Sequence, residues 1–259
     1  MKYFGPPRLS LRFVHVWRRN RLVWRRLAVP SILGNLADPM IYMLGLGYGL
    51  GAMLPDVGGT SYIAFLAAGT VCSSTMMSAS FEAMYSGFSR MHVQKTWDAI
   101  MNTPLTLDDV LLGEVTWAAS KSFLSGMAVL AVAGALGLVA SPLALWLIPV
   151  VLLTGLAFAG LGLIMTALSP NYDFFMYYFT LAITPMMLLS GVFFPVAQLP
   201  EALQGVVQFL PLIHAVALTR PLMNGIVPDG ILLHLAVLAL YAAAAFHIAL
   251  ALTRRRLLK

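Results

Sequence analysis

The chain has 259 residues, of which 60% are apolar and only 10% are charged, and its mean hydropathy is +0.85. Soluble domains carry about a quarter charged residues, so the composition excludes an ordinary soluble domain and predicts an all-α polytopic membrane protein. The single cysteine excludes a disulfide framework and a cysteine-based metal site, and the long, basic and aromatic N-terminus predicts that no signal peptide is cleaved.

Residues 1–29 predict a helix that lies in the membrane interface. They carry eight of the sixteen Lys and Arg residues and no acid. On a helical wheel the arginines gather opposite an apolar, aromatic face, which is typical of a helix resting on anionic lipid headgroups. Because the helix is half apolar, we expect no nucleic-acid partner. The apolar face comprises Phe13, Val16, Trp17, Val23, Trp24 and Leu27.

Residues 30–83 predict two spans, over residues 30–52 and 61–83. Asp38 and Pro39 lie inside the first span. A charge there is costly, so either Asp38 faces protein or water, or a local kink holds its carboxylate near the interface. The second span carries a polar residue at every fourth position, which either lines a translocation path or hydrogen-bonds to neighbouring helices. This polar stripe is Thr70, Ser74, Ser78 and Glu82.

Residues 84–110 are the longest polar interruption between the apolar runs. Wound as one helix, residues 88–101 place Val93, Trp97 and Met101 on one side and Lys95 and Asp98 on the other. Proline 104 ends that helix, and a threonine and an aspartate at 106 and 109 predict a capping box for the next one. The sequence therefore predicts a short amphipathic helix beneath the bundle, with a solvated loop containing one helical turn as the alternative.

Residues 111–194 predict three more spans, over residues 111–139, 143–168 and 174–194. Glu114 and Lys121 share a face of the first of these but lie about two turns apart. We therefore expect each of them to find its own partner or to extend toward the near interface.

Residues 195–229 are too apolar for a plain loop and, with five prolines, too broken to span. We expect two short helices, over residues 201–210 and 213–224, that form a re-entrant hairpin. A sixth span over residues 230–252 and a basic tail to residue 259 follow. The basic chain ends and the basic residues of the 84–110 region fall on one side of six spans, so the positive-inside rule predicts cytoplasmic termini and an external hairpin.

No motif for chemistry is present in the sequence. It has no G-x-x-x-x-G-K-[ST] phosphate loop and no Gly-Lys pair. Ser190 with His214 or His234 is compatible with an intramembrane serine hydrolase, but no G-x-S-x-G motif accompanies these residues. An ion- or proton-driven carrier would need mid-membrane acids and internal repeats, whereas the acids cluster near span ends. We expect no enzyme activity, cofactor or metal on this chain.

The order of an interfacial helix, an amphipathic helix after span two and a broken hairpin before span six resembles the membrane subunit of type-2 ABC exporters. Residues 190–225, SGVFFPVAQLPEALQGVVQFLPLIHAVALTRPLMNG, resemble the signature of that family. The runs ILGNLADPMIYMLGLGYGLG, LTLDDVLLGE and SPNYDFF, among others, resemble its nodulation-factor exporter branch along nearly the whole chain.

The resemblance implies one transmembrane domain over residues 1–259, which dimerises with a second copy in the bacterial inner membrane. Two copies of a separate ABC ATPase would hold the ATP and Mg. The implied cargo is a lipo-chitooligosaccharide, with another lipid, polysaccharide or drug as the alternative. The family's coupling helix maps to about residues 90–101, which implies ATPase-coupling roles for Arg90, Val93, Lys95, Trp97, Asp98 and Met101.

An acylated sugar chain needs a path that is apolar on one side and polar on the other. We expect Phe175 and Tyr178 of the fifth span to meet the acyl chain and the polar stripe to meet the sugar. The hairpin is expected to form an outer gate at the two-fold axis, with a passive external cap as the alternative. Its gate residues are Leu203, Leu210, His214 and Arg220.

Overall fold

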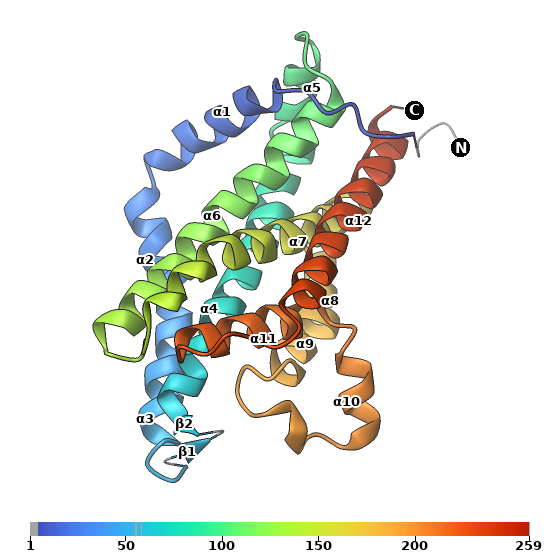
Figure 1. Ribbon diagram of the computed structural model, residues 1–259. Coiled ribbons are helices and arrows are strands. Elements are labelled where there is room, and N and C mark those ends of the chain that lie inside the picture. Colours follow the sequence, from blue (N-terminus) through green and yellow to red (C-terminus); the bar gives the residue numbers. More distant parts are fainter. Residues whose placement is uncertain (1–4, 55, 58, 259) are drawn as a thin grey trace.

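The computed structural model describes residues 5–54, 56–57 and 59–258. The chain folds as an all-helical bundle with one small β-hairpin of strands β1 (Asp56–Val57) and β2 (Thr60–Ser61), as Figure 1 shows. The described residues contain four helices long and apolar enough to cross a membrane, and up to six if each of two bent helix pairs counts as one span. The sequence prediction of an all-α polytopic membrane protein is therefore confirmed.

The N-terminal helix α1 (Phe13–Arg25) lies across the bundle and meets the first apolar helix at 85°. That apolar helix runs from α2 (Ala28–Met40) through a π-helical stretch to α3 (Gly47–Gly49). α1 packs against α6 (Leu107–Ala135), where Gly113 makes the close approach possible. A Cβ at Gly113 would lie 2.6 Å from the Cβ of Val16.

The central helix is α4 (Tyr62–Phe81), which packs against α6, α7 (Leu147–Leu168) and α11 (Pro211–Met223). It continues through two π-helical stretches, η2 (Glu82–Ser86) and η3 (Ser89–Val93). A Cβ at Gly126 of α6 would lie 2.3 Å from the hydroxyl oxygen of Thr75, so α4 and α6 approach this closely only with glycine there.

α6 begins at Leu107 and ends at Ala135, four residues earlier at each end than expected for the third span. The predicted capping box accounts for its start: the Thr106 hydroxyl accepts from the amide of Asp109, and the Asp109 carboxylate accepts from the amide of Thr106. Gly137 has a φ of +73°, a conformation that ends a helix, so the expected extension to residue 139 is wrong.

The fifth apolar segment is shorter than expected. It comprises α8 (Phe174–Tyr178), a π-helical stretch and α9 (Thr184–Leu189), and it ends at Leu189 instead of residue 194. A turn with a φ of +76° at Gly191 follows and redirects the chain toward the hairpin.

The broken apolar segment forms α10 (Glu201–Val207) and α11, which meet at 92°. α11 packs against α4, α7 and α12 (Ile231–Leu257), so its side chains are largely buried. α10 lies outside that packing and exposes apolar side chains. Prolines 200 and 211 precede or open these helices, which is why the sequence located them closely.

Both ends of the described chain lie at the end of the bundle that carries α5 (Thr96–Met101), which we call the α5 end (Figure 1). Arg254 in the last turn of α12 donates to the carbonyl of Gly5 at 2.8 Å. α10 and the β-hairpin lie at the opposite end.

Candidate functional site: a charge network at the α5 end and a polar cavity between the helices

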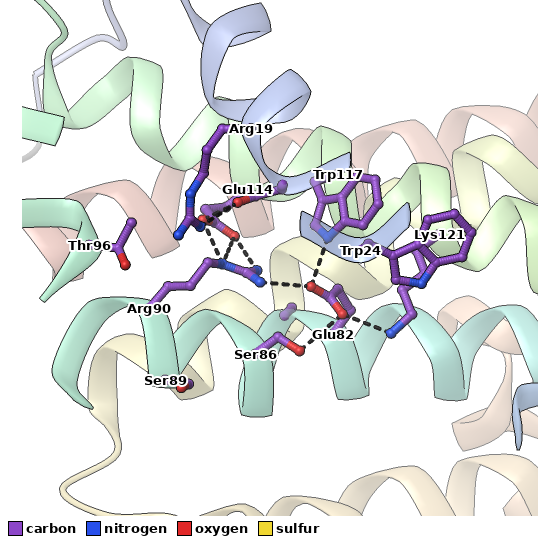
Figure 2. A network of polar contacts seen from close by, with 12 residues as sticks. Arg19, Trp24, Glu82, Ser86, Ser89, Arg90, Thr96, Glu114, Trp117 and Lys121 are labelled. Carbon is purple, nitrogen blue, oxygen red and sulfur yellow. Dashed lines mark hydrogen bonds and ion pairs between the residues drawn. The ribbon is translucent and has the colours of Figure 1, made fainter. Parts of the chain in front are cut away.

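Figure 2 shows a buried network of charges where the end of α4 meets α6. Arg90 of η3 binds two buried carboxylates. Its Nη1 lies 3.0 Å from Oε1 of Glu82, and its Nη2 lies 2.5 Å from Oε2 of Glu114. Its Nε also donates to Oε1 of Glu114 at 3.0 Å. Arg90 therefore joins the two acids with the planar, multi-donor geometry that only a guanidinium offers.

Further donors complete the hydrogen bonding of Glu82. Lys121 Nζ lies 2.9 Å from Oε2, and the Trp117 indole donates to Oε1 at 2.8 Å, both from α6. The hydroxyl of Ser86 also donates to Oε2 at 3.0 Å. A buried carboxylate is tolerated only when paired and hydrogen-bonded in this way.

Glu114 receives donors from two further elements. The indole nitrogen of Trp97 on α5 donates to Oε1 at 3.1 Å, and the amide of Asn20 on α1 donates to the same oxygen at 3.2 Å. Glu114 thus joins α1, α5 and η3 to α6. As the sequence predicted, Glu114 and Lys121 do not pair with each other, and each has its own partner.

A cavity of about 450 Å³ lies beside this network, between α1 and the π-helical end of α4. Its lining includes the cations Arg19, Arg90 and Lys121 and the carboxylate of Glu82. Burial lowers the pKa of the Arg19 guanidinium on α1, as does the charge of Arg90, while Glu114 raises it. Three basic side chains and one acid line the cavity, so positive charge prevails on this wall.

The region after α4 differs from the single helix expected over residues 88–101. Lys95 has a φ of +53° and separates η3 from α5, which changes the helical phase. Val93 is 60% exposed whereas Trp97 is 1% exposed, so the expected shared apolar face is wrong for Val93. Arg90 and Trp97 point inward, Val93 and Lys95 lie exposed, and Asp98 and Met101 are half-buried.

Two acids in the first turn of α6 bind both ends of the described chain beside α5. Arg254 pairs with Asp108, whose Oδ2 also accepts from the amide of Arg8 at 2.7 Å. The hydroxyl of Ser10 donates to Asp109 at 2.5 Å. Sequence reasoning missed this contact, although basic chain ends and an acidic α6 start are its signal.

A second cavity of about 290 Å³ lies between α2, α4 and α6. Three members of the predicted polar stripe line it: Thr70, Ser74 and Ser78. Glu82, the fourth, belongs to the charge network instead. Ser74 bonds Ser125 of α6 at 2.9 Å, as the alternative of hydrogen bonds to neighbouring helices expects, whereas Thr70 donates to the Leu66 carbonyl of its own helix at 2.7 Å.

The rest of the cavity wall is mixed. Its apolar side includes Tyr42, Phe81 and Phe193, together with Met187 of α9. Phe175 and Tyr178, which we expected to line the path, are not among the residues that line this cavity. Phe175 lies in an aromatic cluster, with its ring centroid 5.2 Å from that of Tyr85 and 5.5 Å from that of Phe88.

Two of the four expected gate residues hold the hairpin to the bundle. Nε2 of His214 lies 2.9 Å from the Gln208 carbonyl, and its Nδ1 lies 2.8 Å from Nδ1 of His234 on α12. Arg220 donates to the Gly191 carbonyl at 2.6 Å and stacks 3.6 Å above the ring of Phe65. The other two lie nearer the surface: Leu203 on α10 is exposed and Leu210 is half-buried.

The comparisons agree with this architecture. Residues 12–224 match the family model described as ABC-2 type transporter. Nodulation protein J of Rhizobium leguminosarum bv. viciae is 49% identical over 98% of both chains. Nodulation protein J of Rhizobium meliloti is 50% identical over 95% of this chain and 94% of that protein. The inner membrane transport permease YadH of Escherichia coli is 22% identical over 93% of each. The chain therefore belongs to the ABC-2 type transporter family and is an exporter permease that groups with the nodulation protein J proteins.

Proposed function

We propose that this permease exports an amphipathic glycolipid, a lipo-chitooligosaccharide, across the bacterial inner membrane. The likeness to nodulation protein J over nearly the full chain supports this cargo. The second cavity supports it as well, because its wall joins hydroxyls of α4 to aromatic and methionine side chains. A cargo with a sugar part and an acyl part needs both kinds of surface.

The membrane topology that we propose has six spans: α2–α3, α4, α6, α7, α8–α9 and α12. The α5 end is cytoplasmic, because the arginines of α1 and of the last turn of α12 gather there. α1 lies on the anionic inner leaflet, and α10–α11 form a re-entrant hairpin on the outside.

We assign ATP hydrolysis to two copies of a separate ABC ATPase that hold ATP and Mg and bind a dimer of this chain. The exposed side of the 93–101 region, with Val93 and Lys95, offers a contact surface at the α5 end. Asp98 and Met101, both half-buried, border it.

The charge network carries this proposal for coupling. A displacement of α5 acts on Trp97, whose indole is bonded to Glu114 of α6, and Glu114 is bonded through Arg90 to the end of α4. Because α4 and α6 line the cavity, movement at the ATPase contact reaches the cargo path through buried, paired charges.

At the opposite end, we propose that α10 and α11 of two copies meet across the two-fold axis and close the path from outside. His214 and Arg220 hold α11 in place. The element that moves, or that contacts its counterpart in the second copy, is therefore α10, which has exposed apolar side chains.

The experiment that tests the cargo uses vesicles containing the permease and its copurified ATPase. We expect ATP-dependent movement of an N-acylated chitotetraose, and faster ATP hydrolysis in its presence. The fatty acid alone and unacylated chitotetraose serve as controls, and vesicles without ATP give the background. Transport of another lipid or of a drug, with no movement of the acylated sugar, contradicts the cargo but leaves the exporter assignment standing.

A further inference from the structure

Asp38 stands near the middle of the first span. The helix runs from Ala28 to Gly49, and Asp38 is ten residues from its start, about 15 Å along the axis at 1.5 Å per residue. A charged side chain at that depth is rare and is retained where it faces a polar path or a partner.

The four buried acids of the described chain are all satisfied. Glu82, Glu114, Asp108 and Asp109 each accept several hydrogen bonds or ion pairs. The carboxylate of Asp38, in contrast, makes no hydrogen bond or ion pair with any residue that the structure describes, and it lines the cavity between α2, α4 and α6. The Asp38 side chain is exposed, so its carboxylate is accessible to a ligand that enters the cavity.

Ser78 provides a second, independent observation on the same cavity. Its side chain is buried and lines the cavity, and its hydroxyl oxygen has no hydrogen-bond partner. A buried hydroxyl without a partner costs free energy, which a ligand with both donors and acceptors relieves. Asn35, Ser73 and Ser125 add further polar groups to the wall, and no Lys or Arg lines it.

A cargo rich in O–H and N–H donors fits this wall, because its polar groups are carboxylate, hydroxyl and amide side chains.

We propose that Asp38 is a specificity-determining residue, which accepts hydrogen bonds from the hydroxyl and amide groups of one sugar unit and discriminates by charge. This inference rests on the proposed function. The volume of about 290 Å³ suits one ring of the chain rather than the whole cargo. Tyr42, Phe81 and Phe193 offer apolar surface to the C–H face of that ring. A carboxylate without a nearby cation favours a sugar with a free amine, accepts a neutral one and rejects a sulfated or phosphorylated one.

The test measures equilibrium binding of three labelled probes to the full-length protein in lipid nanodiscs. The probes are an N-acylated chitotetraose, the same molecule with one acetyl group removed, and the same molecule with one sulfate ester. We expect the wild-type protein to bind the amine form tightest and the sulfated form weakest, with at least about a tenfold difference between these extremes. This order tests the inference without any variant.

Asp38→Asn should bring the three affinities together, and Asp38→Glu should keep their order. Ser78→Ala should weaken all three probes by a similar factor without changing the order. Asp56→Asn is the matched control, because Asp56 is an exposed acid on β1 outside the cavity.

The outcomes separate the two proposals. If the wild-type protein binds none of the probes, the proposed cargo is wrong. If it binds all three equally, the cargo stands and the role of Asp38 is overturned. An unchanged affinity order in folded Asp38→Asn protein also overturns it.

Discussion

The indole nitrogen of Trp97 lies 3.1 Å from Oε1 of Glu114 and donates a hydrogen bond to it. This bond joins the six-residue helix α5 directly to the long helix α6. Both partners are buried, so the bond is protected from water.

Trp97→Phe removes only the N–H donor and keeps most of the ring's volume. Glu114 retains Arg90 and Asn20, so we expect the protein to fold with a stability loss of about 2 kcal/mol. We expect a lower ratio of cargo moved to ATP hydrolysed, because the tie between α5 and α6 is lost. Trp146→Phe is the control, since Trp146 is 66% exposed. A normal transport ratio in Trp97→Phe would exclude this route of coupling.

Arg90→Gln leaves Glu82 and Glu114 without their shared cation in a buried site. Removing one partner of a buried ion pair costs about 3–5 kcal/mol, so we expect a large drop in the melting temperature of the detergent-purified protein. Arg90→Lys should recover only part of it, because one ammonium lacks the planar set of donors.

Lys95→Gln is the control for that loss, because Lys95 is exposed and has the same charge sign. Equal melting temperatures for Arg90→Gln and Lys95→Gln would show that the network contributes nothing to stability.

The sequence predicts those structural features that neighbouring residues determine. The Thr106–Asp109 capping box and the proline-bounded helices of the hairpin follow from neighbouring residues, and both agree with the structure. The left-handed conformation of Lys95 does not follow from neighbouring residues. It turns Trp97 toward Glu114, which is 17 residues away in the chain.

The candidate site shows the same division. The four-residue spacing correctly grouped Thr70, Ser74 and Ser78 on one wall, since they share a helix face. It assigned Glu82 to that wall as well, but the partners Lys121 and Arg90 draw its carboxylate into the charge network. Such a choice between partners is set by tertiary contacts, which spacing along one helix does not contain.

Lys95→Glu should weaken binding of the ATPase without destabilising the permease. Lys95 is exposed at the α5 end, where we place the ATPase contact, and it makes no ion pair with any other described residue. Reversing its charge should reduce copurification of the ATPase at low salt, and the melting temperature of the permease alone should stay unchanged. Arg255→Glu, which changes another basic residue that is exposed at the same end, is the matched control. Full copurification of the Lys95→Glu protein would move the contact elsewhere.

The last prediction concerns α10 as the outer gate. Its exposed apolar side chains are not covered by any other described part of the chain. In the proposed dimer they lie where the two copies meet. Leu203 is 39% exposed, Val206 is 61% exposed, and Phe209 just after the helix is 77% exposed. Single cysteines at these three positions should cross-link between subunits in the resting state and block export, because a two-fold axis brings the same patch of both copies together.

The background for this experiment is Cys72→Ser, since Cys72 is buried and its sulfur lies 3.1 Å from the Thr219 hydroxyl, a contact that serine preserves in kind. A cysteine at Val216 is the control, because this α11 side chain is buried against the bundle and should not cross-link. Export should return when the disulfide is reduced. If none of the three α10 cysteines cross-links in an intact dimer, α10 is a passive cap and the gate lies elsewhere on the path.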